Sequence, residues 1–158
     1  MLAGLLPGVR LVLMVRHPVH RVWSAARRIL GLLGGRDLAR VTPAELEAVL
    51  ADPRLHARSD YPAMLDRWGR HFPAEQLHVE VTEDVGRDPR AVLRRIFRHL
   101  GVDEDPGWER LRPEEGVNRN PARDIPAELE ARLRERYRGV VAEMRRRLPV
   151  RTACWDDV

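Results

Sequence analysis

The feature that most constrains the fold is a short apolar segment that leads directly into a helix beginning at a proline. Residues 9–15 (Val-Arg-Leu-Val-Leu-Met-Val) are rich in β-branched side chains, which is typical of a strand buried on both faces of a parallel sheet. Pro18 stands at the position where a helix would begin. Apolar residues then recur at helical spacing as far as Gly34 and Gly35. The sequence therefore predicts a β-α unit at the start of the chain.

One further strand and about four further helices are expected. Residues 76–81 alternate apolar and polar side chains, as a strand does. Helices are predicted after a capping box at residues 42–45, from a Ser59 cap to about residue 72, over residues 88–100, and from about 126 to 147. Residues 102–124 are rich in proline, glycine and charge and are expected to form a loop. The fold class is thus α/β, with parallel strands flanked by about five helices in a single domain over residues 1–158.

Two strands rarely form a stable sheet by themselves. We therefore expect an incomplete sheet with an exposed apolar edge or face beside residues 9–15, through which the chain could associate with a second copy.

Composition narrows the classes of protein. Cys154 is the only cysteine among the 158 residues, so no intrachain disulfide is possible and a cytoplasmic location is expected. No segment approaches the roughly 18 continuous apolar residues of a membrane span, and residues 1–15 lack the features of a signal peptide. The six histidines are scattered and form no metal-ligand cluster, so no metal is expected.

The basic residues behind the net charge of +4 are all arginines, whose side chains are suited to bidentate phosphate contacts. Solvated helix faces explain most of these arginines equally well. A basic nucleic-acid-binding domain is the least favoured alternative, because no recognised nucleic-acid motif or aromatic–basic stripe is present.

The most informative residues are Arg16, Pro18, Arg21 and Ser24. Arg16 follows the first strand, and open α/β sheets bind ligands at the carboxyl ends of their strands. Pro18 begins a helix whose first N–H groups favour an anion. Ser24 lies about two turns into that helix and shares a face with Arg21. These groups could converge on one phosphate, although similar strand-to-helix turns also occur without any ligand.

The pattern Arg16-x-Pro18-x-x-Arg21-x-x-Ser24 resembles the 3′-phosphate-binding motif of sulfotransferases that use 3′-phosphoadenosine 5′-phosphosulfate (PAPS). Further similarities follow in the family's order, and they cover nearly the whole chain. They are Tyr61 with Leu65 and Trp68, the strand ending near Glu83-Asp84-Val85, Asp88-Pro89, Phe97 with Leu100-Gly101, Asn118, the long last helix, and Trp155. The chain is most similar to the bacterial and heparan-sulfate-sulfotransferase-like branch.

This resemblance implies a P-loop-like sulfotransferase fold with PAPS as co-substrate and no metal. It implies that Arg16 and Ser24 hold the 3′-phosphate, with Arg21 beside them and with Arg119 and Arg123 in a loop that reaches back over the cofactor. The family transfers a sulfuryl group to a hydroxyl or amine, so the implied acceptor is a small molecule, a glycan or a lipid.

The sequence departs from the family in one important respect. The family's Pro-Lys-x-Gly-Thr-Thr loop, which wraps the 5′-phosphosulfate, and its catalytic glutamate or histidine lie before the strand at residues 9–15, and neither is present in residues 1–158. The resemblance therefore implies an N-terminally truncated domain whose catalytic residues are expected upstream of Met1. The alternatives are an enzyme that is active in its complete form and a catalytically inactive remnant or fragment.

Other residues allow weaker predictions. Glu83 and Asp84 leave a strand, where a structural role is favoured over a catalytic carboxylate pair. Trp23 and Trp68 lie on apolar helical stripes and are expected in the core. Trp108 or Trp155 could stack on an adenine, although this is the less favoured interpretation. Histidines 20, 56, 71, 78 and 99 have no visible partner in the sequence and receive no role.

Overall fold

Two parallel strands form the centre of the molecule. The computed structural model describes residues 2–35, 37, 40–105, 107, 110, 112–115 and 124–155. Strand β1 (Leu11–Val15) pairs in parallel with β2 (Leu77–Val81), with Leu11 opposite Leu77 and Val15 opposite Val81. Both strands and their parallel pairing confirm the expectation from sequence. Their carboxyl ends lie at the same edge of the sheet.

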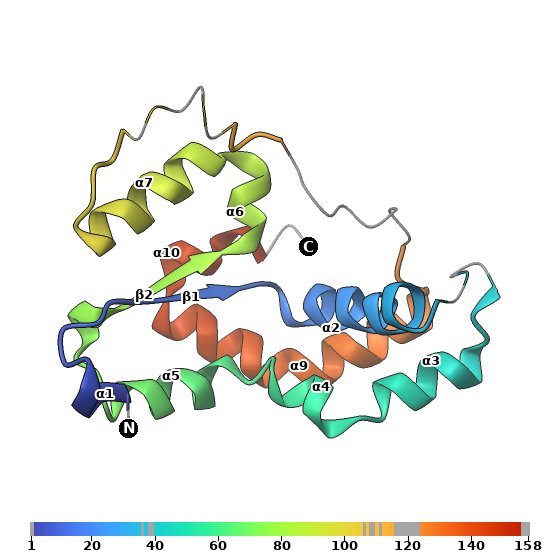
Figure 1. The fold of residues 1–158 in the computed structure, drawn as a ribbon. Coiled ribbons are helices and arrows are strands. Elements are labelled where there is room, and N and C mark those ends of the chain that lie inside the picture. Colours follow the sequence, from blue (N-terminus) through green and yellow to red (C-terminus); the bar gives the residue numbers. More distant parts are fainter. Residues whose placement is uncertain are drawn as a thin grey trace.

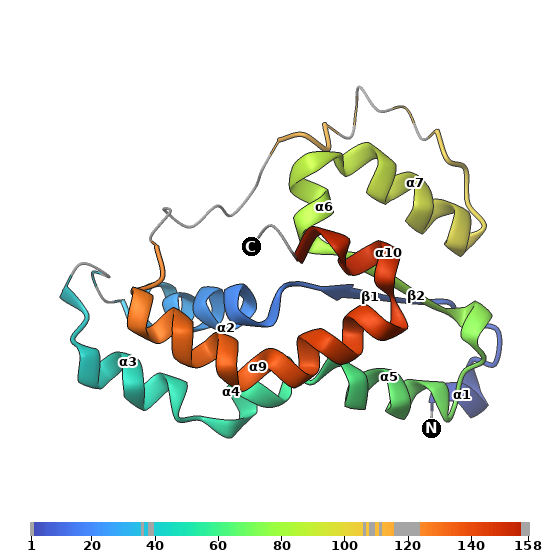
Figure 2. The ribbon, with the colours of Figure 1, turned by 180° about the vertical axis from the view of Figure 1, so that it is seen from behind.

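Helices cover both faces of these strands (Figures 1 and 2). Helices α6 (Thr82–Arg87) and α7 (Pro89–Leu100) lie on one side, and α5 (Tyr61–Gly69) and the long α9 (Ala127–Arg147) lie on the other. Helix α2 (Pro18–Arg27) leaves β1 and runs beside α9, continuing as a π-helical segment, Arg28–Leu33. The remaining helices are α1 (Leu2–Leu5), α3 (Pro43–Leu50), α4 (Pro53–Ala57) and α10 (Pro149–Thr152), with 3₁₀ turns at Ala74–Gln76 and Ala153–Trp155.

The α/β fold class is therefore confirmed, and the long helices lie where the sequence predicts them. The described chain contains more helices than the five expected, because α1, α4, α6 and α10 are each four to six residues long. Helices this short complete too few turns to show a helical period in the sequence.

Helix ends follow from local chemistry. Thr42 and Glu45 form the predicted capping box of α3. The Asp88 carboxylate accepts from the Ala91 amide at the start of α7, and Gly101 ends that helix in the left-handed conformation at φ 74°. The prediction of a Ser59 cap for α5 is wrong. The Asp60 carboxylate accepts from the Ala63 amide instead, because the buried Ser59 hydroxyl is bound elsewhere.

The core consists of two apolar clusters. One joins α2, α3, α4 and α9 and contains Trp23, as predicted. The other joins the two strands to α5, α9 and the C-terminal turns and contains Trp155. Trp68 is only half-buried and lies against Phe72, with ring centroids 5.8 Å apart. The expectation of a core position is therefore met for Trp23 and only partly for Trp68.

An open apolar groove of about 310 Å³ lies between α5 and the sheet. Its lining includes Leu11, Leu13, Trp68 and Leu77. This groove confirms the prediction of exposed apolar surface beside the first strand. Within the described part of the chain, no helix has both the length and the apolar character needed to cross a bilayer.

Candidate functional site

The turn from β1 to α2 is held in place by contacts from three other segments. The Glu83 carboxylate accepts from the His17 amide at 2.8 Å and from the Trp155 indole N–H at 3.3 Å. The Tyr61 hydroxyl donates to the Arg16 carbonyl at 2.9 Å. The backbone that presents Arg16 is thus fixed by α6, by α5 and by the C-terminal turn, as a preorganised binding site requires.

Arg16 and Ser24 lie on either side of this turn. Arg16 follows the last residue of β1, Ser24 lies within α2, and both side chains are half-buried. Pro18 is the first residue of α2, so the amides of Val19 and His20 belong to the first turn and have no acceptor within the helix. A guanidinium, a hydroxyl and a helix start are the donors that a phosphate needs. Convergence of Arg16 and Ser24 on one ligand stays a prediction.

Arg21 is engaged by protein acceptors. Its Nε donates to the Ser59 hydroxyl at 2.5 Å, and its Nη2 donates to the Leu55 carbonyl. Burial lowers the pKa of Arg21, and the nearby Tyr61 and Tyr137 partly offset this effect. These contacts attach α2 to the α4–α5 segment. Any role of Arg21 at a phosphate stays a prediction that depends on its remaining N–H donors.

The other two predicted cofactor residues, Arg119 and Arg123, lie outside the described residues, as do Asn118 and Trp108. Trp155 is described, and it is 1% exposed with its indole N–H bound to Glu83. Such a buried ring is a core side chain, and the adenine-stacking interpretation has no support there.

The structural role predicted for Glu83 and Asp84 agrees with their contacts. Glu83 joins the β1–α2 turn to the C-terminal turn, and the Asp84 carboxylate lies 3.7 Å from Arg95. Each carboxylate is thus engaged with a different segment of the protein, which favours the structural role over a catalytic pair.

Sequence reasoning missed two histidine contacts. His56 bonds the Tyr137 hydroxyl through Nδ1 at 2.5 Å and the Leu50 carbonyl through Nε2 at 2.6 Å. A carbonyl can only accept, so Nε2 carries the proton and Nδ1 accepts from Tyr137. Tyr137 lies 81 residues away in the chain. No local pattern could have revealed this pair.

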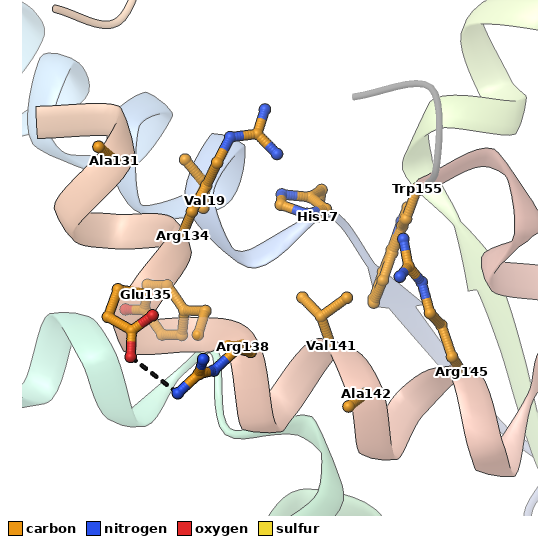
Figure 3. A pocket seen from close by; sticks show the side chains of 11 residues that line it. His17, Val19, Ala131, Arg134, Glu135, Arg138, Val141, Ala142, Arg145 and Trp155 are labelled. Atoms are coloured by element: carbon orange, nitrogen blue, oxygen red, sulfur yellow. Dashed lines mark ion pairs between the residues drawn. The ribbon is translucent and has the colours of Figure 1, made fainter. Parts of the chain in front are cut away.

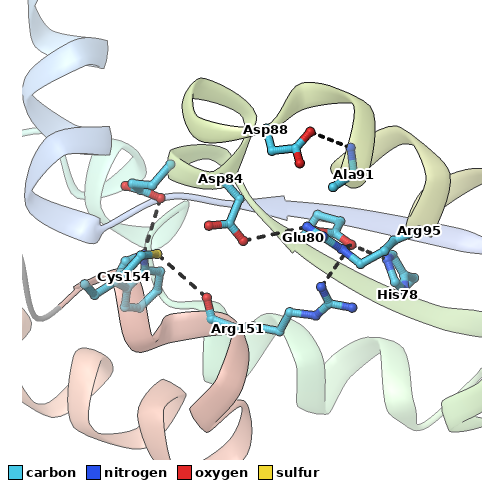
Figure 4. Close-up of polar contacts among 10 residues, drawn as sticks. His78, Glu80, Asp84, Asp88, Ala91, Arg95, Arg151 and Cys154 are labelled. Carbon is cyan, nitrogen blue, oxygen red and sulfur yellow. Dashed lines mark hydrogen bonds and ion pairs between the residues drawn. The ribbon is translucent and has the colours of Figure 1, made fainter.

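The second missed contact belongs to a buried charge network around Glu80 of β2 (Figure 4). Glu80 is fully buried. Its carboxylate accepts two hydrogen bonds from Arg95 at 2.8 Å and one from His78 at 2.7 Å, and Arg151 lies 3.4 Å away. Burial alone would raise the pKa of Glu80, but the bonds from Arg95 and His78 and the charge of Arg151 hold it below its ordinary value. This network joins β2 to α7 and α10.

His17 is the most unusual polar side chain of the turn (Figure 3). It is 4% exposed, and its Nδ1 atom is buried without a hydrogen-bond partner. Burial lowers the pKa of His17 to about 4, with further lowering by His20, Arg134 and Arg145. Its ring faces a cleft of about 570 Å³ between the turn and α9, whose lining includes neither Arg16 nor Ser24.

The sulfotransferase family model matches residues 1–106, which span both strands, the β1–α2 turn and α7. The chain belongs to the sulfotransferase family. No curated protein matches the chain significantly. Membership of this family indicates a transferase and confirms the broad resemblance seen in the sequence. The Arg16-to-Ser24 turn of this sulfotransferase-family chain thus lies inside the matched region, whereas α9 and the C-terminal turn lie beyond it.

Proposed function

We propose that this chain supplies the 3′-phosphate side of a PAPS site in an enzyme that transfers a sulfuryl group to a hydroxyl or amine. The observation that carries the proposal is the position of Arg16 at the carboxyl end of a parallel strand, directly before a helix that begins at Pro18. Ligands of open α/β sheets bind at this edge, and the turn lies inside the region that the sulfotransferase family model matches.

The donor set at the turn fits a phosphate dianion. Arg16 supplies a permanent positive charge, Ser24 a hydroxyl donor, and the first turn of α2 supplies amides with the positive end of the helix dipole. PAPS, when bound, supplies the sulfuryl group and the phosphate leaving group. The residues of this chain orient the nucleotide, which matters because such transfer depends mainly on positioning and electrostatic stabilisation.

Binding of adenosine 3′,5′-bisphosphate, measured by calorimetry beside adenosine 5′-monophosphate, tests the proposal. The two nucleotides differ only in the 3′-phosphate. A charge-assisted contact contributes about 1.5–3 kcal/mol, so the bisphosphate should bind at least roughly tenfold more tightly. Equal affinities would contradict a 3′-phosphate site on this chain.

A second candidate function is binding without catalysis. The observation that favours it is the absence of a Pro-Lys-x-Gly-Thr-Thr loop from residues 1–158. We expect the 158-residue chain to transfer no sulfuryl group from labelled PAPS to a phenol or amine acceptor. A fusion with an upstream segment that carries this loop and the family's catalytic base should restore sulfuryl transfer. Turnover by the 158 residues alone would contradict this expectation, and failure of the fusion would favour an inactive remnant.

A further inference from the structure

The cleft between the β1–α2 turn and α9 has the composition of an anion site. Its α9 wall carries Arg134, Arg138 and Arg145, spaced so that their side chains line one face of the helix (Figure 3). Glu135 is the one acidic residue in the lining, and it pairs with Arg138 at 2.9 Å. Arg134 pairs likewise with Glu130 of the same helix at 2.6 Å. The lining therefore holds three arginines and one acidic residue, with two of the arginines already ion-paired along α9.

His17 gives the cleft a buried ring nitrogen with no hydrogen-bond partner. In the neutral ring one nitrogen carries the proton. His17 lines the cleft, and its Nδ1 atom is buried and unpartnered. Leaving a buried polar atom unpaired typically costs about 1–3 kcal/mol. An oxyanion in the cleft would accept from this nitrogen in its protonated tautomer and would also meet the arginines of α9.

The size and remaining lining of the cleft indicate more than a bare inorganic ion. A volume of about 570 Å³ falls in the range of small-molecule sites. Val141 and Ala142 of α9 provide apolar contact on the same wall. A ligand with an anionic group near His17 and an apolar body along α9 would contact both the charged and the apolar parts of the lining.

We propose that this cleft binds an organic anion, namely a carboxylate, sulfate ester or phosphate ester on an apolar body, at a site that shares the β1–α2 turn but is lined by neither Arg16 nor Ser24. The anionic group lies against His17 and Arg145, and the apolar body lies along Val141 and Ala142. The proposal does not depend on the nucleotide assignment, because neither Arg16 nor Ser24 lines the cleft.

Phenyl sulfate and benzoate serve as probes, with neutral benzamide as the match for benzoate. Calorimetry on the full 158-residue chain should show binding of both anions and at least roughly tenfold weaker binding of benzamide. Arg145→Gln should weaken phenyl sulfate binding about tenfold, and Arg145→Lys should lose less because it keeps the charge.

The matched control is Arg146→Gln. Arg146 is the next residue on α9, pairs with Glu143 and does not line the cleft. Arg146→Gln makes the same charge change as Arg145→Gln, and it should leave the affinity for phenyl sulfate within twofold of the wild-type value. Both variants keep good helix formers at exposed positions, and circular dichroism checks that α9 is intact.

Two further measurements separate this site from the nucleotide site. Arg16→Ala should leave phenyl sulfate affinity unchanged, and the His17 imidazole resonances should titrate at higher pH when phenyl sulfate is bound, because an anion stabilises the charged ring. Equal binding of benzoate and benzamide, equal effects of Arg145→Gln and Arg146→Gln, or loss of phenyl sulfate binding in Arg16→Ala would each overturn the proposal.

Discussion

Glu80 on β2 and His17 just after β1 are both buried polar side chains, but their surroundings differ. Glu80 receives hydrogen bonds from Arg95 and His78, with Arg151 close by. The Nδ1 of His17 has no partner. Buried polar groups are normally satisfied within the protein. The comparison therefore contrasts a network whose hydrogen bonds are satisfied within the protein with a cleft for which we propose a ligand.

The largest effect should come from breaking the complete network. Glu80→Gln removes the charge that Arg95 and Arg151 face, and removing one partner of a buried pair typically destabilises by about 3–5 kcal/mol. Urea unfolding at neutral pH should show this loss. Because the pKa of Glu80 is held below its ordinary 4.5, the wild-type advantage is present above that pH and disappears as pH falls through the lowered pKa.

Glu104→Gln is the matched control for Glu80→Gln. Glu104 pairs with Arg98 near the end of α7, and neither side chain is buried. Surface pairs of this kind contribute little, so its free energy of unfolding should stay close to that of the wild type. A Glu80→Gln protein as stable as the Glu104→Gln protein would remove the distinction between the two regions.

A comparable effect should appear in the pH dependence of stability. The pKa of His17 falls from its ordinary 6.5 to about 4 in the folded chain. Between these values the unfolded state binds the extra proton, so stability is greatest above pH 6.5 and declines as pH falls toward 4. Each unit of separation corresponds to about 1.4 kcal/mol. His17→Gln should remove this part of the decline.

Charged and titratable groups around His17 act on its pKa in both directions. His20, Arg134 and Arg145 oppose its protonation, and Glu130 favours it. Guanidinium unfolding at several pH values between 4 and 7 measures the decline in both proteins. Parallel pH profiles for wild type and His17→Gln would show that His17 is not the neutral, buried group described here.

The sequence predicted the frame of the fold because its signals are local. A β-branched run, a proline at a helix start, a capping box and a glycine at a helix end each act within a few residues. They correctly located β1, β2, α3 and α7. The Ser59 cap failed because the Ser59 hydroxyl is bound by Arg21, 38 residues away. Tertiary contacts had overridden a local preference.

The candidate site also has one part that the local sequence predicts and another that depends on distant contacts. The position of Arg16 and Ser24 around the turn follows from the strand–proline–helix order alone. The cleft at His17 does not, because it exists only where α9 packs beside α2 more than 100 residues later in the chain. The partners of Glu80 are likewise distant, since Arg151 lies on α10. Spacing along the sequence carries no information on such contacts.

The smallest expected effect concerns the apolar groove beside β1, which we expect a second copy of the chain to cover. We expect concentration-dependent self-association, measured by sedimentation velocity. Leu11→Lys places a charge in the groove lining and should weaken association. Met14→Lys is the control, because Met14 is exposed on the same strand but outside the lining. Identical sedimentation of all three proteins as monomers would contradict this expectation.

We propose that the β1–α2 turn holds a nucleotide 3′-phosphate through Arg16. Calorimetric titration of adenosine 3′,5′-bisphosphate into wild type, Arg16→Ala and Arg28→Ala tests it most directly. Arg28 is an exposed arginine just beyond α2 and controls for loss of one positive charge. We expect a loss of affinity of roughly tenfold or more for Arg16→Ala and little change for Arg28→Ala. Equal affinity of Arg16→Ala and wild type would contradict it.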